Sequence, residues 1–529
     1  MIDADTSPDT SPDTRPDARP DARPDARPSS RWLWFALALV ALLAAFVGGA
    51  AGADFGVHWD EWQHVDAANE ALATGRVLPR FYNYPSLTFD LTWMSALAQV
   101  SLAHWRSHGP RPRRAWLADY VMAHNDTLRV RTRWVFLALS LLAGVALFEL
   151  GRALGGPALG ALSTTLFACS HEFLYHARWI APDGLLATAV TTCLASVALA
   201  ARTGRARWLL LGAVAAGLAA SAKYTGVFLV LPVILAGPVF GLGSQRAAWT
   251  RSAWLAALSA VVFFVTTPGA LLEAGTLLTE LAQQREVYAA GHRVYTVEAG
   301  WDHVMHALVY GGTQLFDRWM TLNFALAVFA VVGAVVTLRR RPRLSLVLLS
   351  GALPYFALLV AHRTFIVRNL VPWIPLVALL AAVGLGVSVR SLPRRARASA
   401  WVLVAGVLVL MLARRVDDGL QIARHAPDPS HAFRAAKEHL DAHPELRVYV
   451  ARDVRWRLNP LGLRVEGAVR DPELAERALV LPQRFPSVSP WLIERWYGVH
   501  DVNYRYYHSW HQRKPALVDI ELAREFDEL

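Results

Sequence analysis

The sequence predicts an α-helical polytopic membrane protein with about eleven transmembrane helices, juxtamembrane helices and a small α/β region outside the membrane. Of its 529 residues, 54% are hydrophobic and only 18% are charged, whereas about 25% of the residues of soluble proteins are charged. The charged residues gather between long apolar segments. Basic residues are concentrated in alternate connections, which is typical of a chain that crosses a membrane many times.

The net charge of +11 does not indicate a nucleic-acid partner, because most of the excess arginine lies in short clusters beside apolar segments. Cys169 and Cys193 both fall inside apolar segments. The sequence therefore contains no disulfide framework, no Cys-x-x-Cys pair and no thiolate metal site.

Residues 1–30 are expected to form a disordered cytoplasmic tail. From residue 3 onward they repeat Pro, Asp and Arg without a large apolar side chain whose burial would offset the entropy of ordering. The apolar stretch 32–53 follows and is long enough to cross a bilayer. Its end, Ala51-Gly52-Ala53, resembles a signal-peptide cleavage site, but the polar leader and the apolar stretch are both too long for a signal peptide. We therefore expect an uncleaved first transmembrane helix.

Ten further apolar segments of spanning length follow, and with the first they define a membrane domain over residues 31–415. They cover residues 134–151, 157–175, 184–201, 208–222, 225–243, 252–270, 319–338, 344–361, 369–389 and 399–413. Residues 87–104 are a borderline segment, because they include Asp90 and several small polar residues.

The distribution of basic residues decides whether residues 87–104 cross the membrane. If they do not cross, the short inner connections contain far more basic residues than the short outer ones, as the positive-inside rule requires. The inner residues are Arg152, Arg202, Arg205, Arg207, Arg246, Arg251, Arg339, Arg340, Arg341, Arg343, Arg390, Arg394, Arg395 and Arg397, and the outer ones are Arg178, Lys223, Arg363 and Arg368. A crossing would invert this bias, so we expect a juxtamembrane helix on the outer face.

Three soluble parts then lie on the outer face: the loops at residues 54–133 and 271–318, and a C-terminal region at residues 416–529. Within the C-terminal region, residues 446–450 and 477–481 are typical of short strands, and residues 430–442 have helical periodicity. We expect a small extracytoplasmic α/β domain there.

The first outer loop opens with His58-Trp59-Asp60-Glu61-Trp62-Gln63-His64. Two adjacent carboxylates thus lie at the membrane surface between tryptophans, which are common at that depth. Carboxylates that only solvate a loop are the alternative interpretation. Further along the loop, Tyr84 and Pro85 lead into the expected juxtamembrane helix, and Pro85 restricts the angle at which the chain enters it.

The connection between the third and fourth segments places Arg178 and Asp183 on the same face as Asp60. Charges at the rim of a membrane are costly and usually functional, although a simple ion pair between Arg178 and Asp183 is the alternative. His171 and His176 lack the i, i+4 spacing of a helical metal pair, so we expect structural or hydrogen-bonding roles for them.

Three more basic residues mark the outer ends of later segments. Lys223 follows the fifth segment, and Arg363 and Arg368 lie between the ninth and tenth. A snorkelling lysine without a ligand is the alternative for Lys223. Because outer loops are depleted of basic residues, these side chains and Arg178 are candidates for binding a phosphate.

These motifs resemble, in their order along the chain, those of the polyprenyl-phosphate-sugar-dependent glycosyltransferases of the GT-C fold, near the protein O-mannosyltransferases of family 39 and the bacterial lipid A aminoarabinose transferases. Asp60-Glu61 is similar to the acidic motif of that family, Tyr84-Pro85-Ser86-Leu87 to its Tyr-Pro-Pro-Leu segment, and Arg178 to Asp183 to its second-loop pair. The segments at Lys223 and Arg368 resemble those near the donor phosphate. Ser86 stands where the family segment has its second proline. The residues from 416 onward contain no motif that matches a class of acceptor.

The resemblance implies an enzyme: a membrane glycosyltransferase that moves a sugar from a polyprenyl phosphate to an acceptor hydroxyl on the outer face. Asp60 would be the general base, and Glu61 would orient the acceptor. A single displacement would invert the anomeric carbon. The leaving phosphate would be stabilised by Arg178, Lys223, Arg363 and Arg368, and the substrate would be positioned by His58, His64, Tyr84 and Pro85.

Asp183 would either hold Arg178 or join Asp60 in binding a divalent cation such as Mg²⁺ or Mn²⁺. The sugar, the carrier (undecaprenyl or dolichyl phosphate) and the acceptor (lipid, glycan or protein) stay open. A lipid or sugar transporter, or flippase, is the alternative function, but the sequence shows neither the internal repeats nor the midplane charges usual in transporters. The arginine bias suits a bacterial inner membrane with the active site on its periplasmic face.

Overall fold

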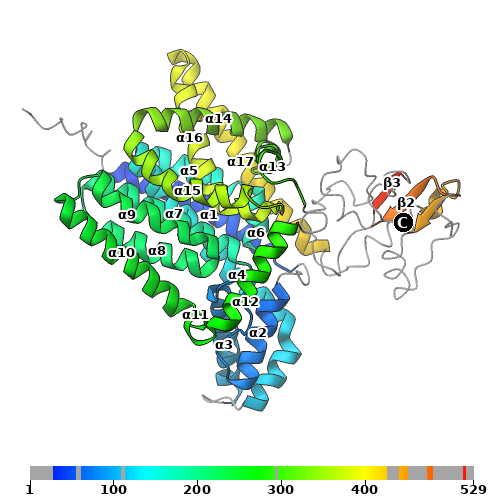
Figure 1. Cartoon of the computed structure of the whole chain (residues 1–529). Coiled ribbons are helices and arrows are strands. Elements are labelled where there is room, and N and C mark those ends of the chain that lie inside the picture. The colour runs from blue at the N-terminus through cyan, green and yellow to red at the C-terminus, as the bar shows by residue number, and fades with distance from the viewer. Residues whose placement is uncertain are drawn as a thin grey trace, which may run out of the picture.

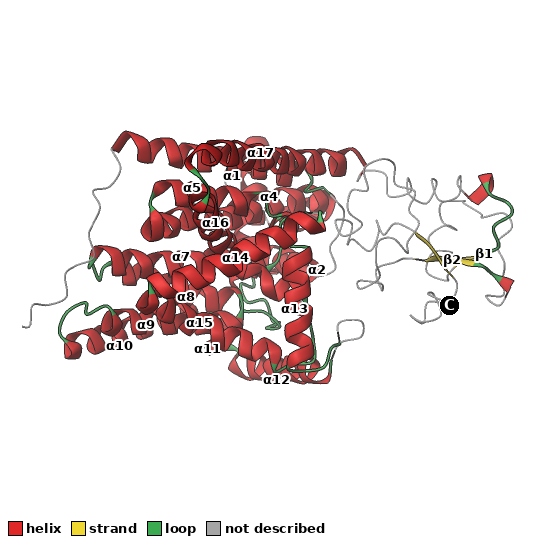
Figure 2. Cartoon of the chain, turned by 90° about the horizontal axis from the view of Figure 1, so that it is seen from above, coloured by secondary structure: helices red, strands yellow, loops and turns green. Residues whose placement is uncertain are grey.

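The computed structural model describes residues 28–54, 61–108, 114–291, 296–317, 319–425, 440–450, 474–480 and 516–519. Long helices run side by side, and shorter helices gather at one end of this bundle (Figure 1, Figure 2). The first elements are α1 (Pro28–Ala51), α2 (Glu61–Thr74), α3 (Leu87–His108), α4 (Arg114–Gly155), α5 (Pro157–Ala168), α6 (His171–Ala177), α7 (Pro182–Thr203), α8 (Trp208–Ala222), η1 (Tyr224–Leu229) and α9 (Val230–Val239). They are followed by α10 (Gln245–Thr266), α11 (Gly269–Leu272), α12 (Ala274–Ala290), α13 (Trp301–Thr313), α14 (Met320–Arg340), α15 (Pro342–Val360), η3 (Val367–Trp373), α16 (Ile374–Ser391) and α17 (Arg394–His425).

Within the described residues, eight helices are long and apolar enough to cross a membrane. They are Arg31–Ala51, Ala123–Gly155, Pro182–Thr203, Gln245–Thr266, Met320–Arg340, Pro342–Val360, Val367–Ser391 and Arg394–Arg424. The other three expected segments contain the shorter apolar helices Pro157–Ala168, Trp208–Ala222 and Tyr224–Val239. A polytopic helical membrane protein is thus confirmed, but eight helices rather than eleven reach spanning length.

Local sequence explains why the expected segment at residues 157–175 is interrupted. α5 ends at Ala168, and Ser170 caps a new helix, α6, because its Oγ accepts a hydrogen bond of 3.2 Å from the amide of Phe173. The same hydroxyl donates to the carbonyl oxygen of Leu315 at 2.6 Å. Such a cap satisfies an amide that has no partner inside the helix. The expected single span is therefore two short helices joined at a buried serine.

The expected segment at residues 225–243 is shortened at both ends. It begins as the 3₁₀ helix η1, in which a Cβ on Gly226 would collide with the carbonyl of Ala219. α9 ends next to Pro238, and Gly241 then adopts a φ of 62°. Proline and a glycine with positive φ both end a helix, so α9 stops after three turns.

The core of the bundle lies around α7. In the apolar stretch of α7 that is long enough to cross a membrane, 83% is buried inside the protein, compared with 6% of the corresponding stretch of α17. Helices approach closely where glycines face one another: a Cβ on Gly333 of α14 would collide with the carbonyl of Leu380 in α16, and one on Gly384 with that of Phe329. Small residues at close crossings are typical of helix packing in membranes.

A second, smaller group is formed by α2, α3 and the start of α4, at the lower right of the bundle in Figure 1. It has its own apolar cluster, which includes Leu72, Val100, Val121 and Leu128. α3 supplies the helix expected at residues 87–104 and is not among the helices apolar enough to span a membrane. Its place at the outer membrane surface stays a prediction.

The described part of the C-terminal region contains a three-stranded sheet. β1 (Val448–Val450) pairs in parallel with β2 (Arg477–Val480), which pairs antiparallel with β3 (Ala516–Asp519). Both expected strands are present, whereas β3 was not expected. The helix expected at residues 430–442 falls outside the described residues except for its last three, and the tail expected at residues 1–30 does so except for residues 28–30, which begin α1.

Candidate active site

A buried ion pair forms at the start of α2. Glu61 and Arg133 of α4 are both 0% exposed, and Arg133 donates from Nε to Oε1 of Glu61 at 2.9 Å and from Nη2 to Oε2. Arg133 Nη1 also reaches the carbonyl oxygen of Ala53 at 2.7 Å, and the amide of Ile180 donates to Glu61 Oε1 at 2.8 Å. The pair therefore joins the ends of α1 and α2 to α4 and to the connection that precedes α7.

Both carboxylate oxygens of Glu61 are thus occupied by protein donors. This geometry favours a positioning role for Glu61 over the expected contact with an acceptor. Asp60 and His58 lie outside the described residues. Because Asp60 directly precedes Glu61, the ion pair holds the chain next to the expected base.

Lys223 lies at the end of α8 and is buried between two other segments. Its Nζ donates to Oδ1 of Asp183, in the first turn of α7, at 2.9 Å and to Oδ1 of Asn369, in η3, at 2.6 Å. Tyr355 of α15 donates its hydroxyl to the carbonyl oxygen of Asn369 at 2.7 Å. Within the described residues, Oδ2 of Asp183 is buried without a hydrogen-bond partner. Such an oxygen is costly to leave unpaired, so it is a candidate for contact with a ligand.

Arg368, which precedes Asn369 in η3, connects this cluster to the segment before α3. Its Nη2 donates to the hydroxyl of Tyr84 at 2.7 Å, and its guanidinium lies 5.9 Å from the centre of that ring. The ring of His64 lies 5.9 Å from Tyr84 and 5.4 Å from Phe81. Pro85 is buried and leads into α3. Two expected phosphate ligands and three expected positioning residues are thus brought into one connected region.

The segment that carries Tyr84 is held by the second outer loop. The hydroxyl of Tyr82 donates to Oε2 of Glu273 at 2.5 Å, and Nε2 of Gln284 donates to Oδ1 of Asn83 at 2.9 Å. Tyr224 of η1 donates to the carbonyl oxygen of Tyr82 at 2.9 Å. Residues that are far apart in the sequence therefore fix this part of the site.

Arg178 does not form the expected pair with Asp183, whose ion-pair partner is Lys223. The buried Arg178 side chain donates from Nε to the carbonyl oxygen of Leu174 and from Nη1 to that of Gly52, both at 3.3 Å. One expected role of Asp183, that of holding Arg178, is therefore replaced by contact with Lys223.

The structure does not bring Arg363 into the buried cluster. Its Nη2 lies 2.6 Å from Oε1 of Glu298, and the two side chains are 43% and 74% exposed. Its amide donates to the carbonyl oxygen of Tyr288 at 3.0 Å. Arg363 is thus a surface ion-pair residue, and the sequence could not separate it from Arg368 because both lie in the same short connection.

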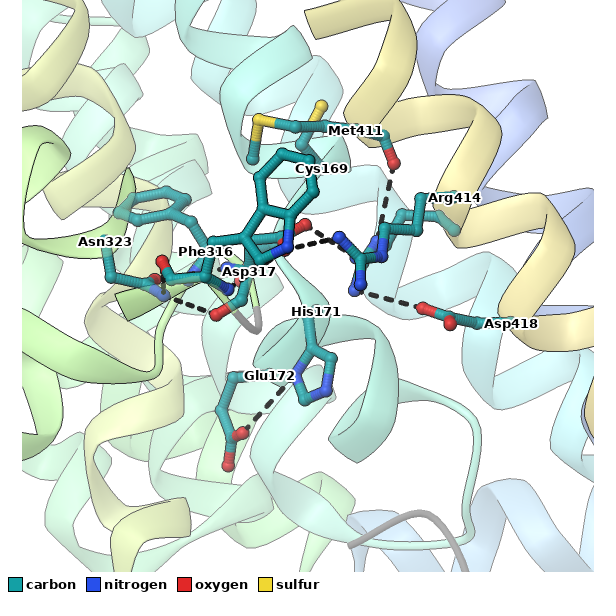
Figure 3. A network of polar contacts seen from close by, with 12 residues as sticks. Cys169, His171, Glu172, Phe316, Asp317, Asn323, Met411, Arg414 and Asp418 are labelled. Atoms are coloured by element: carbon teal, nitrogen blue, oxygen red, sulfur yellow. Dashed lines mark hydrogen bonds and ion pairs between the residues drawn. The ribbon is translucent and has the colours of Figure 1, made fainter. Parts of the chain in front are cut away.

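A second buried network surrounds α6 (Figure 3). Glu172 lies between two histidines, with Oε1 at 3.1 Å from Nε2 of His176 and Oε2 at 3.7 Å from Nδ1 of His171. Arg415 of α17 donates to Oδ2 of Asp317 at 2.8 Å. The amide of His171 donates to the carbonyl oxygen of Phe316, the residue before Asp317, at 3.2 Å. The contact between His176 and Glu172 is a hydrogen bond, as expected for His176, whereas 3.7 Å is too long for a hydrogen bond from the His171 ring to Glu172.

The expected divalent cation would need Asp60, which lies outside the described residues, together with Asp183. Within the part of the chain that the structure describes, no group of three or more His, Cys, Asp or Glu side chains could hold a metal ion. Oδ2 of Asp183 has no hydrogen-bond partner among the described residues, and the other oxygen of this carboxylate is paired with Lys223.

Burial lowers the pKa of His64 from 6.5 to about 3. In the unfolded chain His64 takes up a proton below pH 6.5, whereas the folded protein keeps it neutral, so its contribution to stability is complete above pH 6.5 and is lost as the pH falls towards 3. We expect His64→Gln to reduce the acid-induced fall in the unfolding temperature. The unfolding temperatures of the wild type and the variant at roughly pH 8 and pH 4 measure this difference. Equal falls in unfolding temperature for the two proteins would contradict the prediction.

Residues 108–271 match the sequence model of the dolichyl-phosphate-mannose-protein mannosyltransferase family. The resemblance seen in the motifs is confirmed. The predicted enzyme class, a membrane glycosyltransferase that uses a sugar linked to a lipid phosphate, is confirmed with it. The matched segment is a little under a third of the chain and includes Arg133, Arg178, Asp183 and Lys223, but neither Asp60 nor Arg368.

Solved structures with low sequence identity are also similar to this chain. The apo form of ArnT from Cupriavidus metallidurans is 16% identical, with a TM-score of 0.46, and the alignment covers 93% of this chain and 98% of that one. The same protein bound to undecaprenyl phosphate is 16% identical, with a TM-score of 0.48, and the alignment covers 94% of this chain and 98% of that one. The oligosaccharyltransferase AglB from Archaeoglobus fulgidus, in complex with an inhibitory peptide and a dolichol-phosphate, is 12% identical, with a TM-score of 0.48. That alignment covers 84% of this chain and 61% of AglB. No curated protein matches the sequence significantly.

Arg133 and Asn369 belong to the candidate site but are not among the residues expected from the sequence. Arg133 stands directly before an apolar segment, at the end of the loop that begins with the two carboxylates. Asn369 follows Arg368 in a segment already singled out. Their positions beside these segments are the signal that the sequence offers for both.

Proposed function

We propose that the chain is a GT-C-like glycosyltransferase that moves a sugar from a polyprenyl phosphate to an acceptor hydroxyl on the outer face of the membrane. The observation that carries this proposal is the buried Lys223, held between Asp183 and Asn369. Arg368 is the chain neighbour of Asn369, so α7, α8 and η3 gather two cations and a carboxylate at adjoining helix ends. Asp183 and Lys223 also lie within the segment that matches the family.

Lys223 and Arg368 supply the positive charge that a departing lipid phosphate needs. A phosphate leaving group requires charge stabilisation more than protonation, and donors fixed in advance provide it at low cost of reorganisation. Arg178 is a further phosphate ligand in this proposal. Arg363 is not, because its guanidinium is paired with Glu298 at the surface.

Asp60 accepts the proton of the acceptor hydroxyl as the acceptor oxygen bonds to the anomeric carbon. The bond from that carbon to the phosphate oxygen breaks, and the lipid phosphate leaves with the electron pair, so the anomeric configuration inverts. The Glu61–Arg133 pair positions Asp60, and Asp183 Oδ2 accepts a hydrogen bond from the sugar or joins Asp60 in holding a divalent cation. In a bacterial cell this site would face the periplasm.

Lys223→Met should weaken binding of a polyprenyl phosphate, because a charge-assisted hydrogen bond contributes about 1.5–3 kcal/mol. That corresponds to a loss of roughly 10-fold to 150-fold in affinity. The measurement is titration of the detergent-solubilised protein with undecaprenyl phosphate.

Arg363→Met is the matched control, since it removes an exposed cation that lies five residues before Arg368 in the chain, and the affinity of this variant should be unchanged. The double variant Lys223→Met/Asp183→Asn guards against misfolding from an unpaired buried carboxylate. Equal losses in Lys223→Met and Arg363→Met would point to general charge attraction and contradict the proposed phosphate site.

A further inference from the structure

One face of α13 is apolar and uncovered. Trp301 is 72% and Leu308 is 60% exposed, and Met305 and Val309 are exposed as well. These four residues recur at the spacing of a single helix face. On the other side of the helix His303 is buried. An exposed apolar face of this kind marks a surface that contacts something other than water.

The orientation of α13 distinguishes it from the spanning helices. In Figure 2 the long helices run across the picture, whereas α13 runs crosswise to them at the end of the bundle. It packs against α14, which is long and apolar enough to span a membrane. Met320 and Phe324, near the start of α14, are exposed. Those side chains face lipid if α14 spans the membrane, so α13 packs against a helix that carries a lipid-facing surface.

Contacts with residues 360–365 hold α13 in this orientation. His303 Nδ1 lies 3.2 Å from the carbonyl oxygen of His362, and its ring is 5.1 Å from that of Phe365. At the start of the helix, the amide of Gly300 donates to the carbonyl oxygen of Val360 at 2.8 Å. Because the buried side of α13 is fixed by these contacts, the helix cannot roll to hide its apolar side.

We propose that α13 lies in the plane of the membrane surface, with its apolar face inserted into the lipid leaflet on the side of the candidate active site. Amphipathic helices of this type place their apolar face about 5–10 Å into the boundary between headgroups and acyl chains. Trp301 is the residue type that favours this depth. The occupant of the face is thus the bilayer, and not a second copy of the chain or another protein.

A nitroxide attached at Leu308→Cys tests the proposal in the full-length protein. The native cysteines, Cys169 and Cys193, are buried, so the label should react with the introduced thiol. His306→Cys is the matched control, because His306 is exposed on the same helix but on a different face. In phosphatidylethanolamine and phosphatidylglycerol nanodiscs, the label at Leu308 should collide with oxygen several times more often than the label at His306. It should collide with a water-soluble nickel chelate several times less often.

Two results would overturn the proposal. Equal access of the nickel chelate to both labels would place the apolar face of α13 in water. Shielding of the Leu308 label from both oxygen and the chelate would mean that protein, either a second copy of the chain or a different partner, covers the face.

Discussion

Asp60→Asn is expected to abolish sugar transfer while the protein remains folded and still binds the lipid phosphate. Asparagine keeps the size of the side chain but cannot take the proton of the acceptor hydroxyl. A positioned general base typically contributes about 10²–10⁴-fold to a rate, so transfer should fall by that factor. Binding should persist because the proposed phosphate ligands, Lys223 and Arg368, are unchanged.

Transfer by Asp60→Asn is measured with a radiolabelled polyprenyl-phosphate hexose, alongside binding of undecaprenyl phosphate. Asp66→Asn is the matched control, because Asp66 is an exposed carboxylate on the adjoining helix α2, and it should transfer at the wild-type rate. Unchanged turnover in Asp60→Asn would assign the base to another group. A joint loss of turnover and binding would instead assign Asp60 to donor binding.

Arg133→Met should destabilise the folded protein by about 3–5 kcal/mol, the usual cost of removing one partner from a buried ion pair. The reason is that Glu61 would stay buried after losing its guanidinium partner. The free energy of unfolding in mixed micelles, followed by loss of helical circular dichroism, measures the change. Arg363→Met is the control, since an exposed pair such as Arg363–Glu298 contributes only about 0–1 kcal/mol.

The double variant Arg133→Met/Glu61→Gln should recover part of the stability, because it removes both buried charges together. If Arg133→Met lowers the free energy of unfolding no more than Arg363→Met does, the Glu61–Arg133 pair does not hold the ends of α1 and α2 against α4. Recovery of stability without recovery of transfer would support its positioning role.

Much of the helical architecture could be predicted from the sequence, because long apolar segments have few alternatives to spanning a bilayer. The lengths of individual helices were less predictable. The break at Ser170 depends on a hydroxyl that also reaches Leu315, and the close approach of Gly226 to Ala219 depends on the packing of η1 against α8. Such tertiary contacts are not visible in a hydropathy pattern.

The candidate site was predictable as a set of charges but not as a set of pairs. Lys223 and Asp183 were both singled out, yet their contact depends on how α7 and α8 pack. Arg133 was missed because its partner, Glu61, lies 72 residues away in the chain. Arg363 and Arg368 are similar in the sequence, and only the fold shows that one is exposed and the other buried.

The most direct test of the account is release of the labelled sugar from a radiolabelled polyprenyl-phosphate hexose by the purified protein, with a cell-envelope extract as the source of acceptors. The account predicts that wild-type protein moves the label from the lipid to an acceptor and that Asp60→Asn and Lys223→Met transfer it far more slowly. Movement of intact labelled lipid across the membrane of a proteoliposome, with no cleavage of the sugar–phosphate bond, would contradict it and indicate a transporter.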